Sequence, residues 1–361
     1  MSRQPYLTID LDAIASNYKL LRDCAKVSDC AAVVKANAYG LGAERVTNAL
    51  LDIGCKVFFV AQLSEAVPII DRIRSAGGRL FVLNGLEPES LLDFVSLGAR
   101  PVLNSLRTVE YWLSAAPSAP FAVHLDTGFS RLGLDQKEDR AVVRTLSAGS
   151  AANLELVLSH LACADTPSHE KNQQQLEAFQ NRSPRFRAAQ SSLANSAGIF
   201  LSEAYHFDLV RPGLALYGGQ PIRDRTIDVR PAFVWRAPLL QIRRLKKGDS
   251  VGYGANTIAQ HEMAIAVVGA GYADGLPVAV TNCGTVCING ATFPIFGRVS
   301  MDSFTVNVSA CDNPEALVGA WVELIGPGNS LESQSARTGQ LSYELMVRIS
   351  DRSHRIYAKA S

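Results

Sequence analysis

The chain has 361 residues, of which 47% are hydrophobic, so it is long enough to form two domains with substantial cores. Its 35 lysines and arginines nearly balance its 34 aspartates and glutamates, which argues against electrostatic binding to nucleic acid or to an anionic membrane. The first residues lack the apolar core of a signal peptide, and no apolar run reaches the roughly 20 residues that span a bilayer, so we expect a cytoplasmic protein with a small neutral or zwitterionic substrate.

Short apolar runs that end in a polar or small residue recur through the first two thirds of the chain. Between most of them lie segments with the apolar spacing of amphipathic helices, at 42–54, 64–76, 87–98 and 170–180. Eight such units predict a (β/α)8 TIM barrel, whose active site lies at the carboxyl ends of its strands. A doubly wound open sheet is the alternative, and it explains eight alternating units less economically. The predicted strands are 31–35, 57–62, 80–84, 101–104, 121–126, 154–160, 192–196 and 209–211.

The first predicted strand ends in Lys35, which follows the continuous apolar run 31–34. Such runs are typical of strands covered on both faces, so we expect the amine to be held away from bulk water. Desolvation lowers the pKa of an amine and frees its nitrogen to attack a carbonyl carbon. The alternative is a solvated surface lysine, which is the usual situation of this residue type. The other strand ends, expected at the same edge of the barrel, are Gln62, Asn84, Asn104, Asp126, His160, Asn195 with Ser196, and Arg211.

From about residue 229 the pattern changes to short alternating strands separated by Gly, Pro and Asp turns, which predicts a mostly β second domain. A helix is expected near 335–348, before a closing strand that ends near Tyr357. We place the barrel at 1–228 and the β-domain at 229–361, with the boundary within 224–230. The expected strands of the second domain are 233–242, 263–269, 284–288, 303–308 and 321–325.

The seven cysteines show neither the pairing of a secreted disulfide framework nor the spacing of a zinc site. Cys283 and Cys287 flank a segment with the pattern of a strand, so they do not predict a metal site. We expect reduced thiols throughout, and no metal.

A set of short motifs follows one order along nearly the whole chain. They lie at 10–14, 34–40, 126–128 with 131–133, 194–196, 211–213, 252–255, 271–275 and 300–302. Each motif alone is weak, but the set is highly specific, and together the motifs resemble those of the alanine racemase family.

The resemblance implies a homodimer with shared active sites and pyridoxal 5′-phosphate bound as a Schiff base. Lys35 would hold the cofactor and act as the base on one face of the substrate α-carbon, and Tyr253 of the partner subunit would act on the other face. Racemisation needs two bases because a single rigid base cannot reach both faces. The reference pKa values of lysine and tyrosine, about 10.4 and 10, lie above neutral pH, so neighbouring groups must tune each of them. The reaction would supply D-alanine for peptidoglycan or serve alanine catabolism.

The resemblance also assigns the groups that would bind the cofactor. Arg211 would face the pyridine nitrogen, where a side chain that can only donate leaves the nitrogen unprotonated and weakens the ring as an electron sink. The alternative for Arg211 is a structural salt bridge at the barrel mouth. His160 would pack against the cofactor ring. The phosphate would be bound by Tyr39, by Ser196 and by the backbone amides of Gly213 and Leu214, in keeping with phosphate sites that follow barrel strands seven and eight.

The substrate carboxylate would contact Arg131 and the backbone amide of Met301 of the partner subunit. Tyr272 and Asp302 would line the entrance and support the site. For Arg131 the alternative is a surface charge after a turn, and for Tyr253 it is a half-buried structural tyrosine. Gly252 and Gly254 favour the functional interpretation of Tyr253, because glycines allow close backbone approach and leave the phenol accessible.

Two positions depart from the family pattern. Many members have a carbamylated lysine two residues before the aspartate of the Asp-Thr-Gly motif, where its charge orients the substrate-binding arginine. His124 occupies that position and cannot carry a carbamate, so we predict no modified lysine and expect another acceptor, an anion or water to orient Arg131. Asp351 aligns with a tyrosine that contacts phosphate in the family, and since aspartate would repel phosphate, either the contact is absent or the alignment shifts there.

Other functions share some of these features. Pyridoxal-phosphate-dependent amino-acid decarboxylases have the same barrel, β-domain and a similar lysine motif, but they favour an acidic partner for the pyridine nitrogen, unlike Arg211. A non-catalytic cofactor carrier of the same barrel type would lack residues 229–361. A dinucleotide-binding oxidoreductase would use 269–275, but the last glycine is one position late and Pro277 discourages the helix that the motif must open. The same features also fit a racemase of broader specificity that accepts serine. They fit a biosynthetic role as well as a catabolic one.

Overall fold

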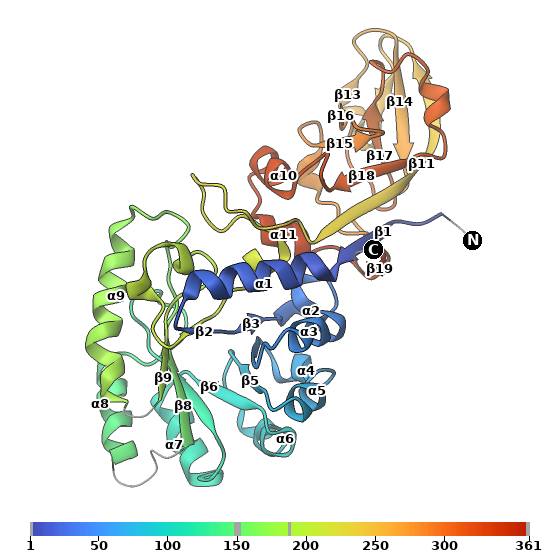
Figure 1. Cartoon of the computed structure of the whole chain (residues 1–361). Helices are drawn as coiled ribbons and strands as arrows, with labels where there is room; N and C mark the ends of the chain where they lie inside the picture. Colours follow the sequence, from blue (N-terminus) through green and yellow to red (C-terminus); the bar gives the residue numbers. More distant parts are fainter. Residues whose placement is uncertain (1–2, 148–152, 187–188, 359–361) are drawn as a thin grey trace. The chain divides into compact units, whose positions relative to one another are not determined.

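The computed structural model describes residues 3–147, 153–186 and 189–358 (Figure 1). The chain divides into two units: a barrel unit of Asp12–Ala38 and Gly42–Arg230, and a β unit of Met1–Leu11, Tyr39–Leu41 and Pro231–Ser361. Residues 1 and 2 lie outside the described residues. They are part of the first residues of the chain, where the sequence predicts no signal peptide. Among the residues that are described, no helix combines the length and the apolar character needed to cross a membrane.

The barrel unit is built from parallel strands. Within the described residues, seven of them form one sheet in the order β3-β4-β5-β6-β7-β8-β9. β10 pairs in parallel with β2, the strand just before β3, and a bridge between Asn195 and Arg211 joins the segments after β9 and β10. The strands therefore close on themselves, which confirms the predicted barrel and makes the open-sheet alternative wrong. The strands are β2 (Asp29–Cys30), β3 (Ala32–Val33), β4 (Val57–Val60), β5 (Arg79–Val82), β6 (Arg100–Leu103), β7 (Phe121–His124), β8 (Leu154–Leu158), β9 (Gln190–Ser192) and β10 (Leu209–Val210).

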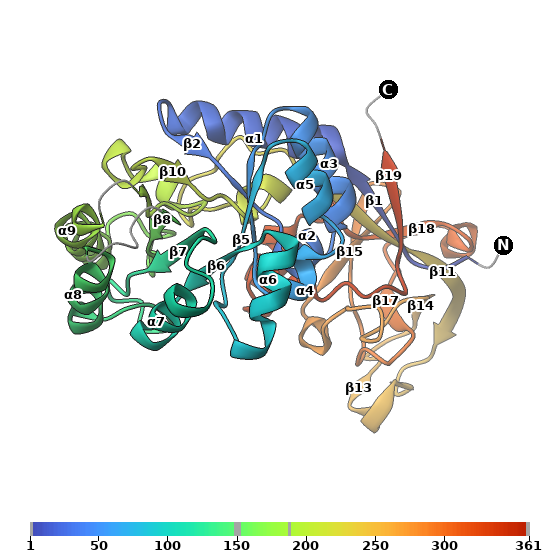
Figure 2. The same cartoon turned by 90° about the horizontal axis from the view of Figure 1, so that it is seen from below.

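The connecting helices lie outside these strands (Figures 1 and 2). The predicted helix over 64–76 is instead two helices, because Pro68 lies between them and lacks the amide hydrogen that a continuous helix requires. The helices are α1 (Leu11–Ala25), α3 (Ala43–Asp52), α4 (Leu63–Ala66), α5 (Ile70–Ser75), α6 (Leu91–Leu97), α7 (Leu106–Ala115), α8 (Gln136–Thr145) and α9 (Glu170–Arg182).

The apolar runs that predicted the strands form the core of the barrel unit. All four residues of β4 are buried, as expected for a parallel strand covered on both faces. Phe59 of β4 stacks on Phe81 of β5, with ring centroids 5.1 Å apart. The polar residues that follow the strands are thus the first groups beyond an apolar interior, which places chemistry at the strand ends.

The β unit has a mixed sheet in the order β16-β15-β18-β11-β1-β19, with β14 on β11 and β17 on β14. Its first strand, β1, precedes the barrel in the chain, within the range we assigned to the barrel domain. It belongs to the β unit because it pairs antiparallel with β11 and parallel with β19. The strands are β1 (Tyr6–Asp10), β11 (Phe233–Leu245), β12 (Ser250–Val251), β13 (Thr257–Ile258), β14 (Met263–Val268), β15 (Thr285–Ile288), β16 (Ala291–Pro294), β17 (Phe304–Asn307), β18 (Trp321–Ile325) and β19 (His354–Ala358).

The single helix predicted near 335–348 is wrong in its extent. The structure has two helices, α10 (Leu331–Thr338) and α11 (Ser342–Val347). Gly339 ends α10 with a left-handed φ of 69°, a conformation that glycine adopts without a steric penalty.

Candidate active site

Lys35 follows β3 directly and begins the short segment α2 (Lys35–Tyr39). Its side chain is half-buried beside the barrel core. The pKa of Lys35 is lowered from its ordinary value, first by burial and then by the positive charge of Arg131, while Glu65 acts in the opposite direction. A lowered pKa increases the neutral fraction of the amine, which is the form that attacks carbonyl carbons.

The backbone after Lys35 forms a left-handed turn, although it contains no glycine. Ala36, Asn37 and Ala38 have φ values of 51°, 54° and 54°, and Tyr39 also has a φ of 54°. Left-handed helical geometry costs about 1–2 kcal/mol per residue for L-amino acids, so specific contacts must hold the turn.

Two side chains hold this turn within the barrel unit. Glu65 Oε1 accepts a hydrogen bond from the amide of Ala36 at 2.7 Å, and Asn37 Oδ1 accepts one from the amide of Ala43 at 2.7 Å. The second oxygen of Glu65 accepts from the amides of Ala61 at 2.7 Å and Gln62 at 3.1 Å, so one carboxylate joins the end of β4 to the turn after Lys35.

Arg211 follows β10 and is buried. Its guanidinium donates to the hydroxyl of Ser192 and, at 2.5 Å, to the backbone carbonyl of Ser159. Burial lowers the pKa of Arg211 to about 10, so the group remains charged at neutral pH. Among the described residues its hydrogen-bond partners are a hydroxyl and a carbonyl rather than a carboxylate, which does not support the alternative of a structural salt bridge.

Ser196 and Gly213 lie together after β9 and β10. The hydroxyl oxygen of Ser196 accepts hydrogen bonds from the amides of Gly213 at 2.8 Å and Ala215 at 3.2 Å. It therefore caps the short 3-10 helix Leu214–Tyr217. The predicted phosphate-binding residues of this segment thus sit where helix-end amides and a hydroxyl converge, which is chemistry that suits an anion.

His124 is buried at the end of β7. Its Nδ1 lies 2.9 Å from Asn104 Oδ1, and the Asn104 amide nitrogen donates to the carbonyls of Leu83 and Val102 at 3.1 and 2.9 Å. This network assigns the proton to Nδ1 and leaves Nε2 as an acceptor. In the described part of the chain Nε2 has no hydrogen-bond partner. Burial, then the charge of Arg211, lowers the pKa of His124 to about 4, so the ring is neutral near pH 7.

The turn after β7 carries Phe129 and Arg131. Asp126 Oδ1 accepts hydrogen bonds from the amides of Gly128, Phe129 and Ser130 at 2.9, 3.0 and 3.1 Å. Burial alone would raise the pKa of Asp126, but these three donors outweigh it and lower the pKa. The Arg131 guanidinium carbon lies 4.3 Å from the centroid of the Phe129 ring.

His160 follows β8, and its ring packs against Phe129 with centroids 5.3 Å apart and planes at 67°. Burial holds the pKa of His160 well below its ordinary value, and the charges of Arg211 and Arg131 lower it further. The Phe129 ring therefore contacts both the guanidinium of Arg131 and the imidazole of His160.

The remaining predicted site residues belong to the β unit. Burial raises the pKa of Tyr39. Tyr253, Met301 and Tyr272 are exposed, with 71%, 51% and 44% of their surface accessible. Tyr253 lies between Gly252 and Gly254, whose φ values of 75° and 82° require glycine-like freedom.

The loops that carry Tyr272 and Met301 are packed together. The amide of Tyr272 donates to the carbonyl of Ser300 at 3.1 Å, and the amide of Ala273 donates to that of Met301 at 3.0 Å. A side chain at Gly271 would lie 2.2 Å from the Met301 carbonyl oxygen, so the approach requires glycine. The backbone thus holds these two exposed side chains in one surface region of the β unit.

An ion-pair network supports these loops. Arg352 bonds Asp302 at 2.7 Å and lies 3.3 Å from Asp274, whose other oxygen accepts from the amide of Gly271 at 2.8 Å. Burial raises the pKa of Asp274. The side chain of Asp351 is 98% exposed and lies 3.3 Å from Arg355. The absence of a phosphate contact at Asp351 stays a prediction.

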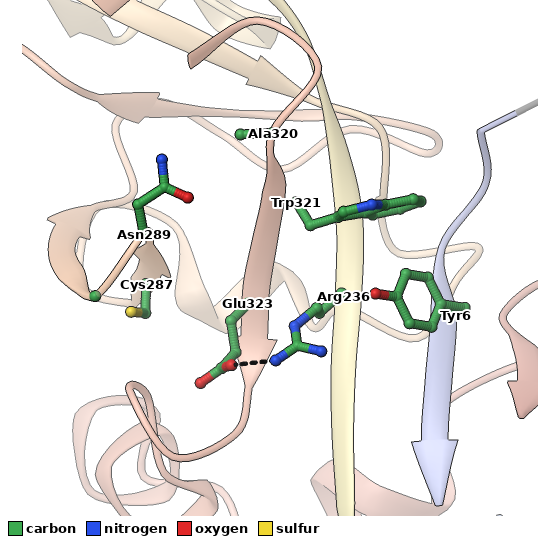
Figure 3. Close-up of a pocket in the computed structure, with 8 residues that line it drawn as sticks. Tyr6, Arg236, Cys287, Asn289, Ala320, Trp321 and Glu323 are labelled. Carbon is green, nitrogen blue, oxygen red and sulfur yellow. Dashed lines mark hydrogen bonds and ion pairs between the residues drawn. The ribbon is translucent and has the colours of Figure 1, made fainter. Parts of the chain in front are cut away.

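A pocket of about 460 Å³ lies in the β unit (Figure 3). In it Arg236 points toward Glu323 at 3.2 Å, and the rings of Tyr6 and Trp321 meet edge to face with centroids 4.6 Å apart. None of the predicted site residues lines it. It is lined by Tyr6, Arg236, Cys287, Asn289, Gly290, Ala320, Trp321 and Glu323.

The structure thus divides the predicted residues between the units. Lys35, Arg131, His160, Ser196, Arg211, Gly213 and Leu214 lie in the barrel unit, and Tyr39, Tyr253, Tyr272, Met301 and Asp302 lie in the β unit. The sequence did not single out Glu65, Phe129, Ser159 or Ser192. Glu65 had a detectable signal, because Gln62 and Glu65 have the spacing of a capping box, which the structure contains. Among the described residues, no cluster of histidine, cysteine, aspartate or glutamate side chains is suited to a metal ion.

Comparison with known proteins gives one consistent result. Residues 9–221 match the family model described as alanine racemase, N-terminal domain, and residues 232–357 match alanine racemase, C-terminal domain. A protein of Rhodospirillum rubrum named alanine racemase is 44% identical over 359 residues, covering 97% of this chain and 95% of that protein. A protein of Agrobacterium fabrum named catabolic alanine racemase is 39% identical over 356 residues, covering 98% of this chain and 92% of that protein.

Solved structures agree with this result. The alanine racemase of Bartonella henselae with covalently bound pyridoxal phosphate superposes with a TM-score of 0.93 at 37% identity, covering 99% of this chain and 100% of that chain. The biosynthetic alanine racemase of Pseudomonas aeruginosa superposes with a TM-score of 0.92 at 37% identity, with the same coverage of 99% and 100%.

Proposed function

The chain belongs to the alanine racemase family, and from this membership we propose that it interconverts L-alanine and D-alanine with pyridoxal 5′-phosphate as its cofactor. The match over both family domains, at residues 9–221 and 232–357, is the observation that carries the proposal. The relatives include proteins named catabolic and biosynthetic, so the similarity favours neither role.

The polar groups of the barrel unit fit this cofactor by their chemistry. Lys35 offers a partly desolvated amine to the aldehyde, Arg211 offers a buried donor to the ring nitrogen, and Ser196 offers a hydroxyl to the phosphate. When bound, the cofactor supplies an electron sink that makes the α-proton of an amino acid acidic. Arg211 can only donate, so it leaves the ring nitrogen unprotonated, which favours return of the proton over side reactions and argues against a decarboxylase.

We assign the two proton transfers to Lys35 and to Tyr253 of the partner subunit. Each base serves one face of the α-carbon: one removes the proton and the other returns one. Arg131 and the backbone amide of Met301 of the partner subunit bind the substrate carboxylate, and His160 packs on the cofactor ring. Tyr39 and the amides of Gly213 and Leu214 complete the phosphate site, while Tyr272 and Asp302 support the entrance.

The shared-site homodimer in this proposal is supported by the surface of the β unit. Tyr253, Met301 and Tyr272 are large side chains that are 71%, 51% and 44% exposed, and the latter two sit on loops that the backbone fixes together. Large exposed side chains on rigid loops are typical of surfaces that bind a partner.

A first experiment tests the two bases. We expect Lys35→Ala to lose the visible absorption band of the attached cofactor and to lose racemisation, because the attachment point is gone. We expect Tyr253→Phe to keep the band and to lose most racemisation in both directions, measured separately from each alanine enantiomer. Lys19→Ala and Tyr111→Phe, at exposed positions of the barrel unit, are the matched controls and should retain both properties. Unchanged racemisation by Tyr253→Phe would refute the two-base assignment.

A second experiment tests the shared site. Differently tagged Lys35→Ala and Tyr253→Phe chains are coexpressed, and dimers that carry both tags are isolated. If each site takes Lys35 from one subunit and Tyr253 from the other, a mixed dimer has one intact site and one with both changes. A random mixture should then recover about one quarter of wild-type activity, and the purified mixed dimer about half. Isolated mixed dimers without activity would show that each subunit builds its own site.

A further inference from the structure

The guanidinium of Arg131 contacts the ring of Phe129. In the described part of the chain its guanidinium forms no hydrogen bond or ion pair, and it lies over the face of Phe129 at 4.3 Å from the ring centroid. A cation within about 6 Å of a ring centroid is attracted by the negative charge of the ring face. Asp126, the carboxylate on the same turn, already accepts three backbone amides at Oδ1.

Phe129 is itself held from two sides. Its amide donates to Asp126 Oδ1 at 3.0 Å, which fixes its backbone, and its ring packs against His160 at 5.3 Å. The ring is half-buried, and the Arg131 guanidinium lies over it. A guanidinium that lies over a ring can still donate from its edge, which carries the donors that bind a carboxylate in two parallel hydrogen bonds.

We propose that Phe129 is the positioning residue for Arg131: its ring holds the guanidinium in place for the carboxylate of the amino-acid substrate and links it to His160. This inference rests on the proposed function, in which Arg131 binds that carboxylate. An arginine side chain loses much rotamer freedom when it binds a ligand, and stacking on Phe129 restricts that freedom beforehand. Many family members orient this arginine with a carbamylated lysine, at the position that His124 occupies in this chain. The Phe129 ring provides a contact for Arg131 in place of that lysine.

The test separates the ring face from apolar volume. Phe129→Leu keeps an apolar side chain and removes the ring, whereas Phe129→Tyr keeps the ring. Binding of propionate, which is alanine without its amino group, is measured on the cofactor-loaded enzyme by calorimetry, together with KM and kcat for alanine. We expect Phe129→Leu to weaken propionate binding and to raise KM by about three- to tenfold, with a smaller change in kcat, and Phe129→Tyr to stay within about twofold of wild type.

Two controls make the result specific. Phe200→Leu removes a second Phe–Arg pair, in which Arg225 lies 5.8 Å from the ring centroid, and should leave propionate binding unchanged. In an Arg131→Gln background, Phe129→Leu should have little further effect, because residues that act through one another are not additive. An equal loss in both backgrounds, or equal loss in Phe129→Leu and Phe129→Tyr, would overturn the proposal. A wild type that binds propionate but does not racemise alanine would instead contradict the proposed function.

Discussion

Replacing Glu65 by alanine removes the carboxylate that accepts hydrogen bonds from Ala36, Ala61 and Gln62. A hydrogen bond to a charged group contributes about 1.5–3 kcal/mol, but Ala36 and Gln62 are exposed, so water replaces part of it. The loss of a helix cap costs about 1 kcal/mol. We therefore expect Glu65→Ala to lower the free energy of unfolding by about 2–3 kcal/mol.

The same substitution should affect the turn after Lys35 more than the rest of the barrel. Left-handed backbone costs about 1–2 kcal/mol per residue. A turn that has lost its anchor therefore lowers its free energy when it relaxes to another conformation. We expect faster hydrogen exchange at the amides of 36–39. We also expect slower attachment of pyridoxal phosphate, which is measured by the visible absorption of the attached cofactor.

Glu138 provides a matched control for this experiment. It also accepts a backbone amide of its own capping box, from Asp135 at 3.2 Å, and one from another element, from Leu106 at 3.0 Å. Glu138→Ala should therefore lower stability by a comparable amount while leaving cofactor attachment unchanged. The reasoning fails if Glu65→Ala is as stable as wild type, or if both variants slow attachment equally.

The remaining predictions concern His124. Its pKa is about 4 in the folded protein and about 6.5 when unfolded, so the unfolded state binds more protons between these values and stability falls as pH decreases through that window. Wild type should lose on the order of 2 kcal/mol more than His124→Gln between pH 6.5 and 4.5 in urea unfolding, and parallel pH profiles would contradict this. The intact mass should show no added carbon dioxide at any lysine, and such an addition near the site would contradict the assignment of His124.

The barrel could be predicted because its strands are buried on both faces, which produces the continuous apolar runs in the sequence. The sheet to which β1 belongs could not be predicted in this way. Its five residues alternate as those of many strands do, and its partners β11 and β19 lie more than two hundred residues away in the chain. Register of this kind depends on contacts that no local pattern contains.

The candidate site shows the same division. Lys35 and Arg211 could be found from the sequence because each follows an apolar run. Ser192 and Ser159, which bind Arg211, could not, since they become neighbours only when β8 and β9 align in register. The left-handed turn contradicts local propensity, because none of residues 36–39 is glycine and the contact from Glu65 comes from 29 residues away.

The charges in the barrel unit explain why its titratable groups are shifted together. The positive charge of Arg131 lowers the pKa of Lys35, of His124 and of His160, and that of Arg211 lowers the pKa of both histidines. Burial is the larger cause and acts in the same direction on all three groups, so the neutral fraction of each increases. The two arginines therefore place positive charge beside three groups whose pKa values are lowered. A phosphate or carboxylate ligand would offset that charge and raise the pKa of Lys35, so substrate binding itself would prepare the amine to take up a proton.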